Sequence, residues 1–221
     1  MSNILIFGFN CEGTTDKRFL ESIIQKTFEE IALECPQDID VYPVNYITVP
    51  SNNIGFIEKT KLLAKKAFDT GIQILCIHTD ADANTNDFML QNKIIPTLNA
   101  INAIENNICK NIVPIIPIHM SEAWMLADKE LLKEEINTTK TDIELNIAKP
   151  PEGIADPKET IENAINIAQR DIPNKIHKIT ISDLYQPIGQ NISLNSLKEL
   201  QSYIIFRESV ILAFKKLNYI R

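Results

Sequence analysis

Two short polar segments of the sequence hold carboxylates at spacings that suit a divalent metal ion. Glu12 and Asp16 lie four residues apart in the first, and Asp80 and Asp82 form an Asp-x-Asp pair in the second. Alternate residues of an extended segment project to one side, so Asp80 and Asp82 could share a ligand. Gathered carboxylates repel one another unless a cation neutralises them, and oxygen ligands without cysteine favour Mg²⁺ or Mn²⁺ over Zn²⁺. Each residue alone suits a helix cap or a turn, whereas the set predicts a metal site.

A third polar cluster, His119 with Ser121 and Glu122, offers an imidazole, a hydroxyl and a further carboxylate. His119 is expected either to line the same site or to be a structural residue. Lys17 and Arg18 belong to the first cluster and could meet a phosphate, but adjacent helical residues point apart, so only one of them would do so. A solvated helix face is the alternative for both.

Apolar patterns predict the elements that position these clusters. Short apolar runs ended by polar turns indicate buried strands, at residues 4–9, 41–49, 72–78 and 112–118. Apolar residues at three- and four-residue spacing indicate helices, at residues 16–33, 53–68, 88–108, 121–132, 161–169 and 197–217. Residues 178–181 could add a short strand. Strands separated by helices predict a mainly parallel sheet, whose strand ends face one ligand-binding edge.

The fold class expected from this order is a Rossmann-like α/β fold with helices flanking the sheet. Residues 1–134 would form the α/β core, and residues 135–221 a helical extension packed on it as one structural unit. The 221 residues, 44% of them hydrophobic, suffice for one sizeable core. The formal net charge of −7 argues against a broadly basic surface for duplex DNA, so a nucleic-acid contact must be local, metal-mediated or assisted by a partner.

Targeting signals and reactive thiols are not evident in the sequence. No apolar run reaches the roughly 18 residues of a membrane span, and the first residues lack the pattern of a signal peptide, so a cytoplasmic location without membrane contact is expected. The four cysteines lack Cys-x-x-Cys spacing and are expected to be free thiols. His78, in an apolar run, and Trp124, in a predicted helix, are expected to pack in the core.

The motifs also resemble those of a known family. Glu-Gly-Thr-Thr-Asp-Lys-Arg-Phe-Leu from Glu12 and His-Thr-Asp-Ala-Asp-Ala from His78 resemble the two signature motifs of the Toprim domain, which topoisomerases, primases and OLD-type nucleases share. This resemblance covers roughly residues 3–120. Ser-Glu-Ala-Trp-Met-Leu-Ala-Asp from Ser121, with the tail from Leu184 onwards, is similar to a small stand-alone Toprim-related family of bacteria. Its members are often encoded beside ATPases, in settings that suggest defence against phage.

The Toprim-like resemblance implies a role for each candidate residue. Glu12 would be a metal ligand or general acid/base, and Asp80 and Asp82 would hold the ion, so these three form the expected catalytic set. Asp16 and Glu122 resemble the extra carboxylates that let OLD-type sites hold a second ion. The expected metal ligands are thus Glu12, Asp16, Asp80, Asp82 and Glu122. The expected phosphate or substrate contacts are Gly13, Lys17 and His119.

Three functions are compatible with these residues. The first is a Mg²⁺- or Mn²⁺-dependent nuclease that acts on DNA or RNA in phage defence or DNA maintenance, with an ATPase partner and as either a monomer or a homodimer. The second is a non-catalytic Toprim-like subunit that binds nucleic acid or nucleotide and regulates an ATPase. The third is a hydrolase of small phosphorylated molecules. The carboxylate set favours the first, and the acidic composition favours the other two.

Overall fold

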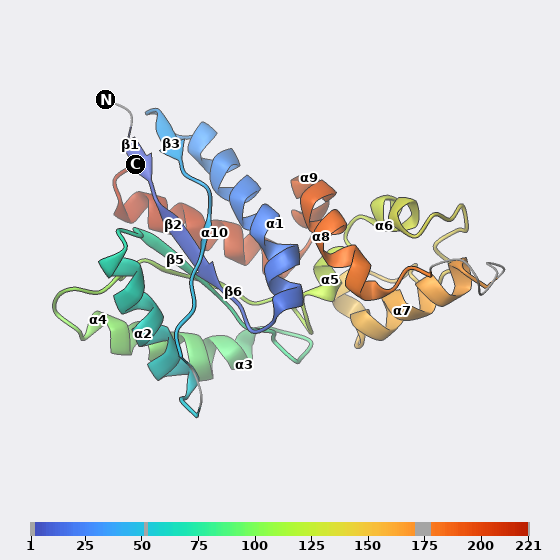
Figure 1. Cartoon of the computed structure of the whole chain (residues 1–221), viewed down its shortest axis with the longest axis horizontal. Helices are drawn as coiled ribbons and strands as arrows, with labels where there is room; N and C mark the ends of the chain where they lie inside the picture. The colour runs from blue at the N-terminus through green and yellow to red at the C-terminus, as the bar shows by residue number, and fades with distance from the viewer. Residues whose placement is uncertain (1–2, 51–52, 171–177, 221) are drawn as a thin grey trace.

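The computed structural model describes residues 3–50, 53–170 and 178–220, and it shows parallel strands flanked by helices (Figure 1). The strands are β1 (Asn3–Leu5), β2 (Phe7–Asn10), β3 (Ile39–Val41), β4 (Asn45–Tyr46), β5 (Ile74–His78) and β6 (Ile112–Ile115). Their order is β4-β2-β5-β6, and β1 pairs with β3 beside this sheet. Every pairing among these strands is parallel, which confirms the α/β fold expected from the sequence.

The two strand pairs β1–β3 and β2–β4 are one long pairing with a defect in the middle. Asn3 pairs with Ile39, and Gly8 pairs with Asn45. The segment that contains β3 and β4 therefore has one residue more between the two ladders than the segment that contains β1 and β2. Pro43 lies in this interval and has no N–H to donate to a ladder. The strand predicted over residues 41–49 is therefore divided into β3 and β4, and the two together begin and end earlier than the predicted strand.

The helices largely follow the predicted apolar periods. They are α1 (Thr14–Leu33), α2 (Phe56–Asp69), α3 (Asp87–Met89), the π-helix η1 (Leu90–Ile94), α4 (Ile95–Asn102), α5 (Glu122–Met125), α6 (Lys129–Glu135), the 3₁₀-helix η2 (Pro151–Gly153), α7 (Pro157–Ala168), α8 (Ile181–Asn191), α9 (Leu194–Leu197) and α10 (Gln201–Lys216). Among these, α6 and α7 extend away from the sheet (Figure 1).

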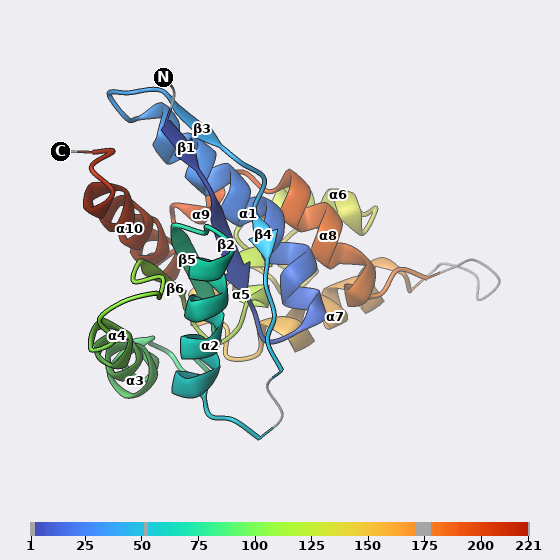
Figure 2. The same ribbon diagram turned by 60° about the vertical axis from the view of Figure 1, so that its left-hand side comes forward.

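Helices cover the two faces of the sheet (Figure 2), and the buried apolar residues form a layer beneath the helices of each face. Phe7, Phe9 and Cys76 are buried in the layer that includes α1, α8 and α10. Leu75 and Ile77 are buried in the layer that includes α2 and α4. Alternate residues of β5 thus face different helices, and this alternation decides which helices surround the residues that follow the strand.

The strand suggested for residues 178–181 is wrong, because Ile181 is the first residue of α8 and the three residues before it carry no strand. A capping box starts this helix: Asp183 accepts hydrogen bonds from the Thr180 backbone N–H at 2.9 Å and from its hydroxyl at 2.7 Å. Pro187 and Gly189 interrupt the helical pattern in the sequence, yet α8 continues through both.

The helix predicted over residues 88–108 is present from α3 to α4 but is not regular. Pro96 stands at the start of α4, directly after η1. A proline lacks the N–H for the carbonyl four residues back and collides with it in a regular α-helix. The wider π-helical turn of η1 accommodates this proline. Lys93 lies within that turn.

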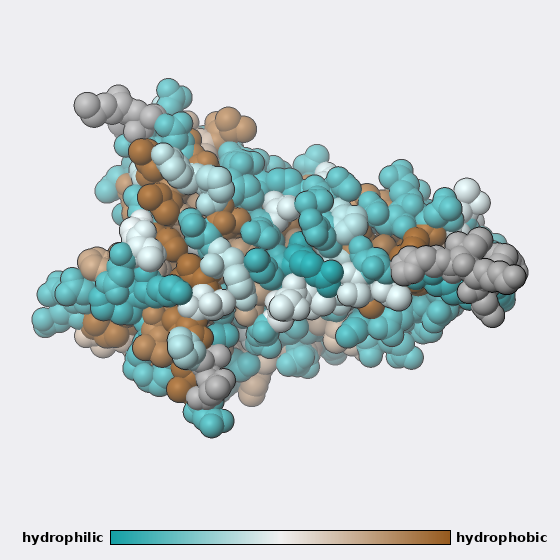
Figure 3. Space-filling view, in the orientation of Figure 1, coloured by the Kyte–Doolittle hydropathy of each residue, from teal (hydrophilic) through white to brown (hydrophobic). Residues whose placement is uncertain are grey.

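The buried position expected for Trp124 and the free thiols expected for the cysteines are confirmed. Trp124 is fully buried, and its Nε1–H donates a hydrogen bond of 2.8 Å to Ser202. All four cysteines are free thiols. No helix in the described part of the chain is long and apolar enough to cross a membrane. The face seen in Figure 3 is mainly hydrophilic, with apolar side chains gathered in a band on one side of the view. Ile4 and Tyr42 are apolar side chains that are about half exposed.

Candidate functional site at the carboxyl edge of the sheet

The clusters predicted to carry chemistry lie around the carboxyl ends of β2 and β5. β4 pairs on one side of β2 and β5 on the other, so the chain order reverses at β2. In open parallel sheets, ligands bind outside the strand ends at such a reversal. Glu12 follows β2, and Thr79 and Asp80 follow β5.

Glu12 and Thr79 join the two strand ends directly. The hydroxyl of Thr79 donates a hydrogen bond of 2.9 Å to Oε1 of Glu12. Thr79 is buried and Glu12 is exposed, so the hydroxyl orients a carboxylate that otherwise faces solvent. The ammonium group of Lys93 lies 3.4 Å from the same hydroxyl oxygen.

Asp80 is held at one of its two oxygens. Its Oδ1 accepts a hydrogen bond of 3.0 Å from the backbone N–H of Ser121 and lies 3.2 Å from Nε2 of His78. No bond to Oδ2 is present within the described ranges, so that oxygen can take a ligand. Asp80 is partly exposed, as a ligand-binding group must be.

His78 is buried beneath these carboxylates. Burial lowers its pKa, but the hydrogen bond and charge of Asp80, with the charges of Asp16 and Glu12, outweigh burial and raise the pKa above its ordinary value. Its Nδ1 has no hydrogen-bond partner among the residues that the structure describes. The core position expected for His78 is correct, but only one of its ring nitrogens is satisfied.

A chain of hydrogen bonds links Asp80 to three helices. The hydroxyl of Ser121 donates to Oδ1 of Asp16 at 2.8 Å and lies 3.4 Å from Glu122. Glu122 also accepts a hydrogen bond from the hydroxyl of Tyr185, on α8. Burial raises the pKa of this phenol, as do the hydrogen bond and the charge of Glu122, so Tyr185 keeps its proton and donates this hydrogen bond.

Asp82 differs from the extended geometry assumed for the Asp-x-Asp pair. Its φ is 51°, in the left-handed region, and its side chain is exposed. Its backbone N–H bonds the carbonyl of His119 at 2.9 Å, and the N–H of His119, whose φ is 60°, bonds the carbonyl of Ala83 at 3.1 Å. Asp80 and Asp82 therefore do not present their carboxylates as neighbours on one extended strand. The imidazole of His119 is buried.

The predicted phosphate contacts in the first turn of α1 have protein partners. The N–H of Gly13 bonds Oδ2 of Asp16 at 3.0 Å. Lys17 lies over the ring of Tyr46, 4.8 Å from its centre. Arg18 donates to the backbone carbonyl of Ser182 at 3.0 Å and so ties α1 to α8. These contacts stabilise the position of α1, and the phosphate roles of Gly13, Lys17 and His119 stay predictions.

Oxygen donors dominate the edge, which suits a hard cation. Within the described residues, however, no three His, Cys, Asp or Glu side chains converge into a metal-binding group. Mg²⁺ in enzymes is commonly held by only one or two carboxylates, with waters and substrate phosphates completing its shell. Glu12 and Asp80 fit that role, since each has an oxygen with no protein bond in the described structure.

The comparison with known proteins places the chain in a family. A family model described as a domain of unknown function, DUF4276, matches residues 11–199. The chain belongs to the DUF4276 family. No curated protein and no solved structure matches this DUF4276 chain. The matched part begins at the end of β2 and contains all the candidate site residues from Glu12 to Tyr185.

A small cavity of the DUF4276 chain opens beside Glu12, on the side of the sheet covered by α2. Its volume is about 300 Å³, and its lining residues are Asn10, Glu12, Phe56, Lys59, Thr60, Leu63, Ile77, His78 and Lys93. Lys59 and Lys93 were not foreseen from the sequence. Lys59 lies four residues before buried Leu63 on the inner side of α2, a spacing that could have indicated it, whereas Lys93 depends on the π-turn.

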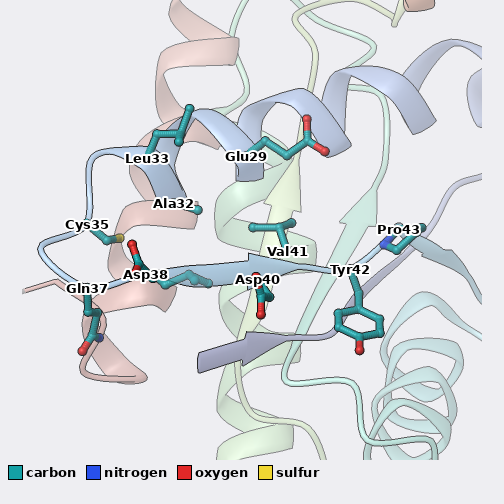
Figure 4. A pocket seen from close by; sticks show the side chains of 11 residues that line it. Glu29, Ala32, Leu33, Cys35, Gln37, Asp38, Asp40, Val41, Tyr42 and Pro43 are labelled. Carbon is teal, nitrogen blue, oxygen red and sulfur yellow. The ribbon is translucent and has the colours of Figure 1, made fainter. Parts of the chain in front are cut away.

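A larger cavity, of about 880 Å³, lies between the end of α1 and β3 (Figure 4). It is lined by Glu29 and Asp38 among others and sits at the opposite edge of the sheet. Glu29 is thirteen residues after Asp16, which places it roughly 20 Å along the axis of α1 from the carboxylate cluster. Size alone therefore does not mark the candidate site, and the convergence of polar groups does.

Proposed function

We propose that this DUF4276 protein is a divalent-metal-dependent phosphodiesterase that cleaves nucleic acid. The observation that supports this proposal best is the hydrogen bond between Thr79 and Glu12 at the point where the strand order reverses, with Asp80 next along the chain. An oriented carboxylate beside a second carboxylate with a free oxygen is the minimum that Mg²⁺-dependent phosphate chemistry needs.

Mg²⁺ or Mn²⁺ would be held by Glu12 and Asp80, with Asp82 able to approach from its exposed turn. When bound, the cation would supply positive charge that stabilises the phosphoryl oxygens of the transition state. The chain's own residues would do the rest. Glu12 would accept the proton of the attacking water, since Thr79 holds it at the strand end, and His78 would keep Asp80 oriented. As the P–O bond breaks, the departing oxygen would take a proton from solvent.

Asp16 and Glu122 suit a different role from direct metal binding. Both oxygens of Asp16 accept hydrogen bonds from the protein, one from Gly13 and one from Ser121. Glu122 is buried and bonded to Tyr185. We propose that these two carboxylates position Ser121, whose N–H orients Asp80, and that one cation suffices for the reaction.

The hydrogen bonds of Asp16 and Glu122 to other parts of the protein support a second candidate function. If Asp16 and Glu122 mainly connect helices, the edge could bind nucleic acid or nucleotide without cleaving it and regulate an ATPase. In either case, we propose an ATPase partner and a cytoplasmic role in phage defence or DNA maintenance. The support is the resemblance to Toprim-related proteins and the net charge of −7, which leaves nucleic-acid binding in need of a metal or a partner.

The decisive experiment is cleavage of plasmid, single-stranded DNA and RNA with Mg²⁺ or Mn²⁺ by the full chain. The test variants are Glu12→Gln and the double variant Asp80→Asn, Asp82→Asn. Asp87→Asn removes an exposed carboxylate at the start of α3 and serves as the matched control. Cleavage that both test variants lose and the control keeps supports the enzyme. Metal binding without cleavage of any substrate supports the regulatory subunit, and cleavage by both test variants disproves the site.

A further inference from the structure

The cavity beside Glu12 holds charges that the cleavage proposal does not use. Lys59 comes from α2 and Lys93 from η1, and both side chains are partly buried along the same wall. Neither forms an ion pair with a carboxylate in the described part of the chain, although the protein has seven more acidic than basic side chains. Two partly desolvated cations without a carboxylate partner make this cavity attractive to an anion.

The position of Lys93 connects this cavity to the candidate catalytic carboxylate. Its ammonium group is 3.4 Å from the Thr79 hydroxyl, which in turn bonds Glu12. The π-turn before Pro96 carries this lysine, and π-helical turns inside helices occur frequently at functional sites. An anion bound by the lysines would therefore lie directly beside Glu12, in a cavity that His78 also lines.

The remaining walls favour a nucleotide over a bare ion. Asn10 and Thr60 supply polar groups. The ammonium group of Lys93 lies over the ring of Phe56, 5.6 Å from the ring centre. A volume of about 300 Å³ is at the lower end of small-molecule sites, roughly 300–1,000 Å³. One nucleotide unit fits such a space, whereas a duplex does not.

We propose that the Lys59–Lys93 cavity binds a single nucleotide unit through its phosphate, next to the phosphodiester that Glu12 would act on. This assignment rests on the proposed function for its substrate class, and it makes single-stranded nucleic acid or a strand end the substrate. Phosphate binding by the two lysines is separate from cleavage and can be measured without a metal ion.

The test is calorimetric titration of the full chain with thymidine 5′-monophosphate, inorganic phosphate and thymidine, in buffer containing EDTA. Thymidine monophosphate is expected to bind at least tenfold more tightly than inorganic phosphate, and thymidine is expected not to bind. Lys59→Gln and Lys93→Gln should each weaken binding of the monophosphate at least tenfold, because each removes a charge from the cavity. Lys93→Arg keeps the charge and should retain binding.

Lys65→Gln is the matched control, since this exposed lysine lies on the same helix and pairs with Asp69 instead of facing the cavity. Thermal unfolding of each variant checks the fold. Equal affinity of wild type and both glutamine variants overturns the proposal, as does inorganic phosphate binding as tightly as the monophosphate. Glu12→Gln should abolish cleavage without weakening monophosphate binding, because it removes a negative charge from the cavity wall. Lysine-dependent binding in a protein that never cleaves nucleic acid would therefore reject the proposed function and leave this inference standing.

Discussion

Thr79 donates a hydrogen bond of 2.9 Å to Glu12 and thereby joins the ends of β5 and β2. Thr79 is almost fully buried, whereas Glu12 is exposed, so the hydroxyl of the buried threonine orients the carboxylate of the exposed glutamate. A hydrogen bond to a charged group contributes about 1.5–3 kcal/mol, which corresponds to roughly one to two powers of ten in rate if it matters only in the transition state. Thr79→Val keeps the shape and removes the hydroxyl, and it should lower kcat of the proposed cleavage reaction by about that factor.

Steady-state kinetics on a single-stranded substrate would measure this effect, with KM expected to change little. Thr79→Ser keeps a hydroxyl at the same place and should retain most of the activity. A valine variant that cleaves at the wild-type rate would show that Glu12 needs no orientation by Thr79.

Gly189 allows α8 to cross α1 at very short range. A Cβ atom at this position would lie 2.2 Å from the backbone carbonyl oxygen of Phe19, a distance that the two helices can relieve only by moving apart. Gly189→Ala should therefore destabilise the protein by about 1–3 kcal/mol, the usual cost of overpacking a core. Urea unfolding would measure the loss. Gly153→Ala is the control, because a Cβ there meets no atom within 4 Å.

The carboxyl edge could be foreseen from the sequence because it depends on local patterns. The apolar runs before Glu12 and Asp80 predict strands, and parallel strands put their ends at one edge whatever the rest of the chain does. The conformation of Asp82 could not be foreseen, because its positive φ is fixed by backbone bonds to residues near His119, far along the chain. Tyr185 was missed for a related reason: it meets Glu122 across 63 residues of sequence.

The helical boundaries show the same division between local and distant causes. Predicted helix 197–217 begins only at Gln201, where Glu152 accepts the backbone N–H groups of Gln201 and Ser202, both at 2.9 Å. A capping residue about fifty positions away leaves no local signal. By contrast, the capping box of Thr180 and Asp183 is local, and attention to that spacing would have replaced the suggested strand with a helix.

The hydroxyl of Tyr185 donates a hydrogen bond to the buried carboxylate of Glu122. Tyr185→Phe removes the hydroxyl and leaves this buried carboxylate with the weaker contact to Ser121, at 3.4 Å. The free energy of unfolding should fall by about 1–3 kcal/mol, the cost of an unsatisfied buried group. Tyr203→Phe is a matched control: Thr27, which loses the phenol, still donates to the carbonyl of Ile23. Urea unfolding should show a smaller loss for Tyr203→Phe, and equal losses would deny Tyr185 this role.

Glu30 on α1 ties the C-terminal helices to the core through two cations. It bonds Lys198 at 2.8 Å and Arg207 at 3.2 Å. Burial would raise its pKa, but the hydrogen bonds and charges of Lys198 and Arg207 outweigh burial and lower the pKa below its ordinary value of 4.5. A carboxyl with a lowered pKa stabilises the fold fully above its unfolded-state pKa, and this stabilisation is lost as the pH falls through the folded-state pKa.

Glu30→Gln should therefore cost about 1 kcal/mol of unfolding free energy at pH 7, because the ion pairs are partly exposed, and progressively less in acid. Urea unfolding of wild type and variant between pH 7 and pH 3 would measure this difference. Glu58→Gln removes an exposed pair within a single helix and should have little effect at either pH. A Glu30→Gln deficit that stays constant as the pH falls would mean that packing of the side chain, and not its charge, connects α1 to α9 and α10.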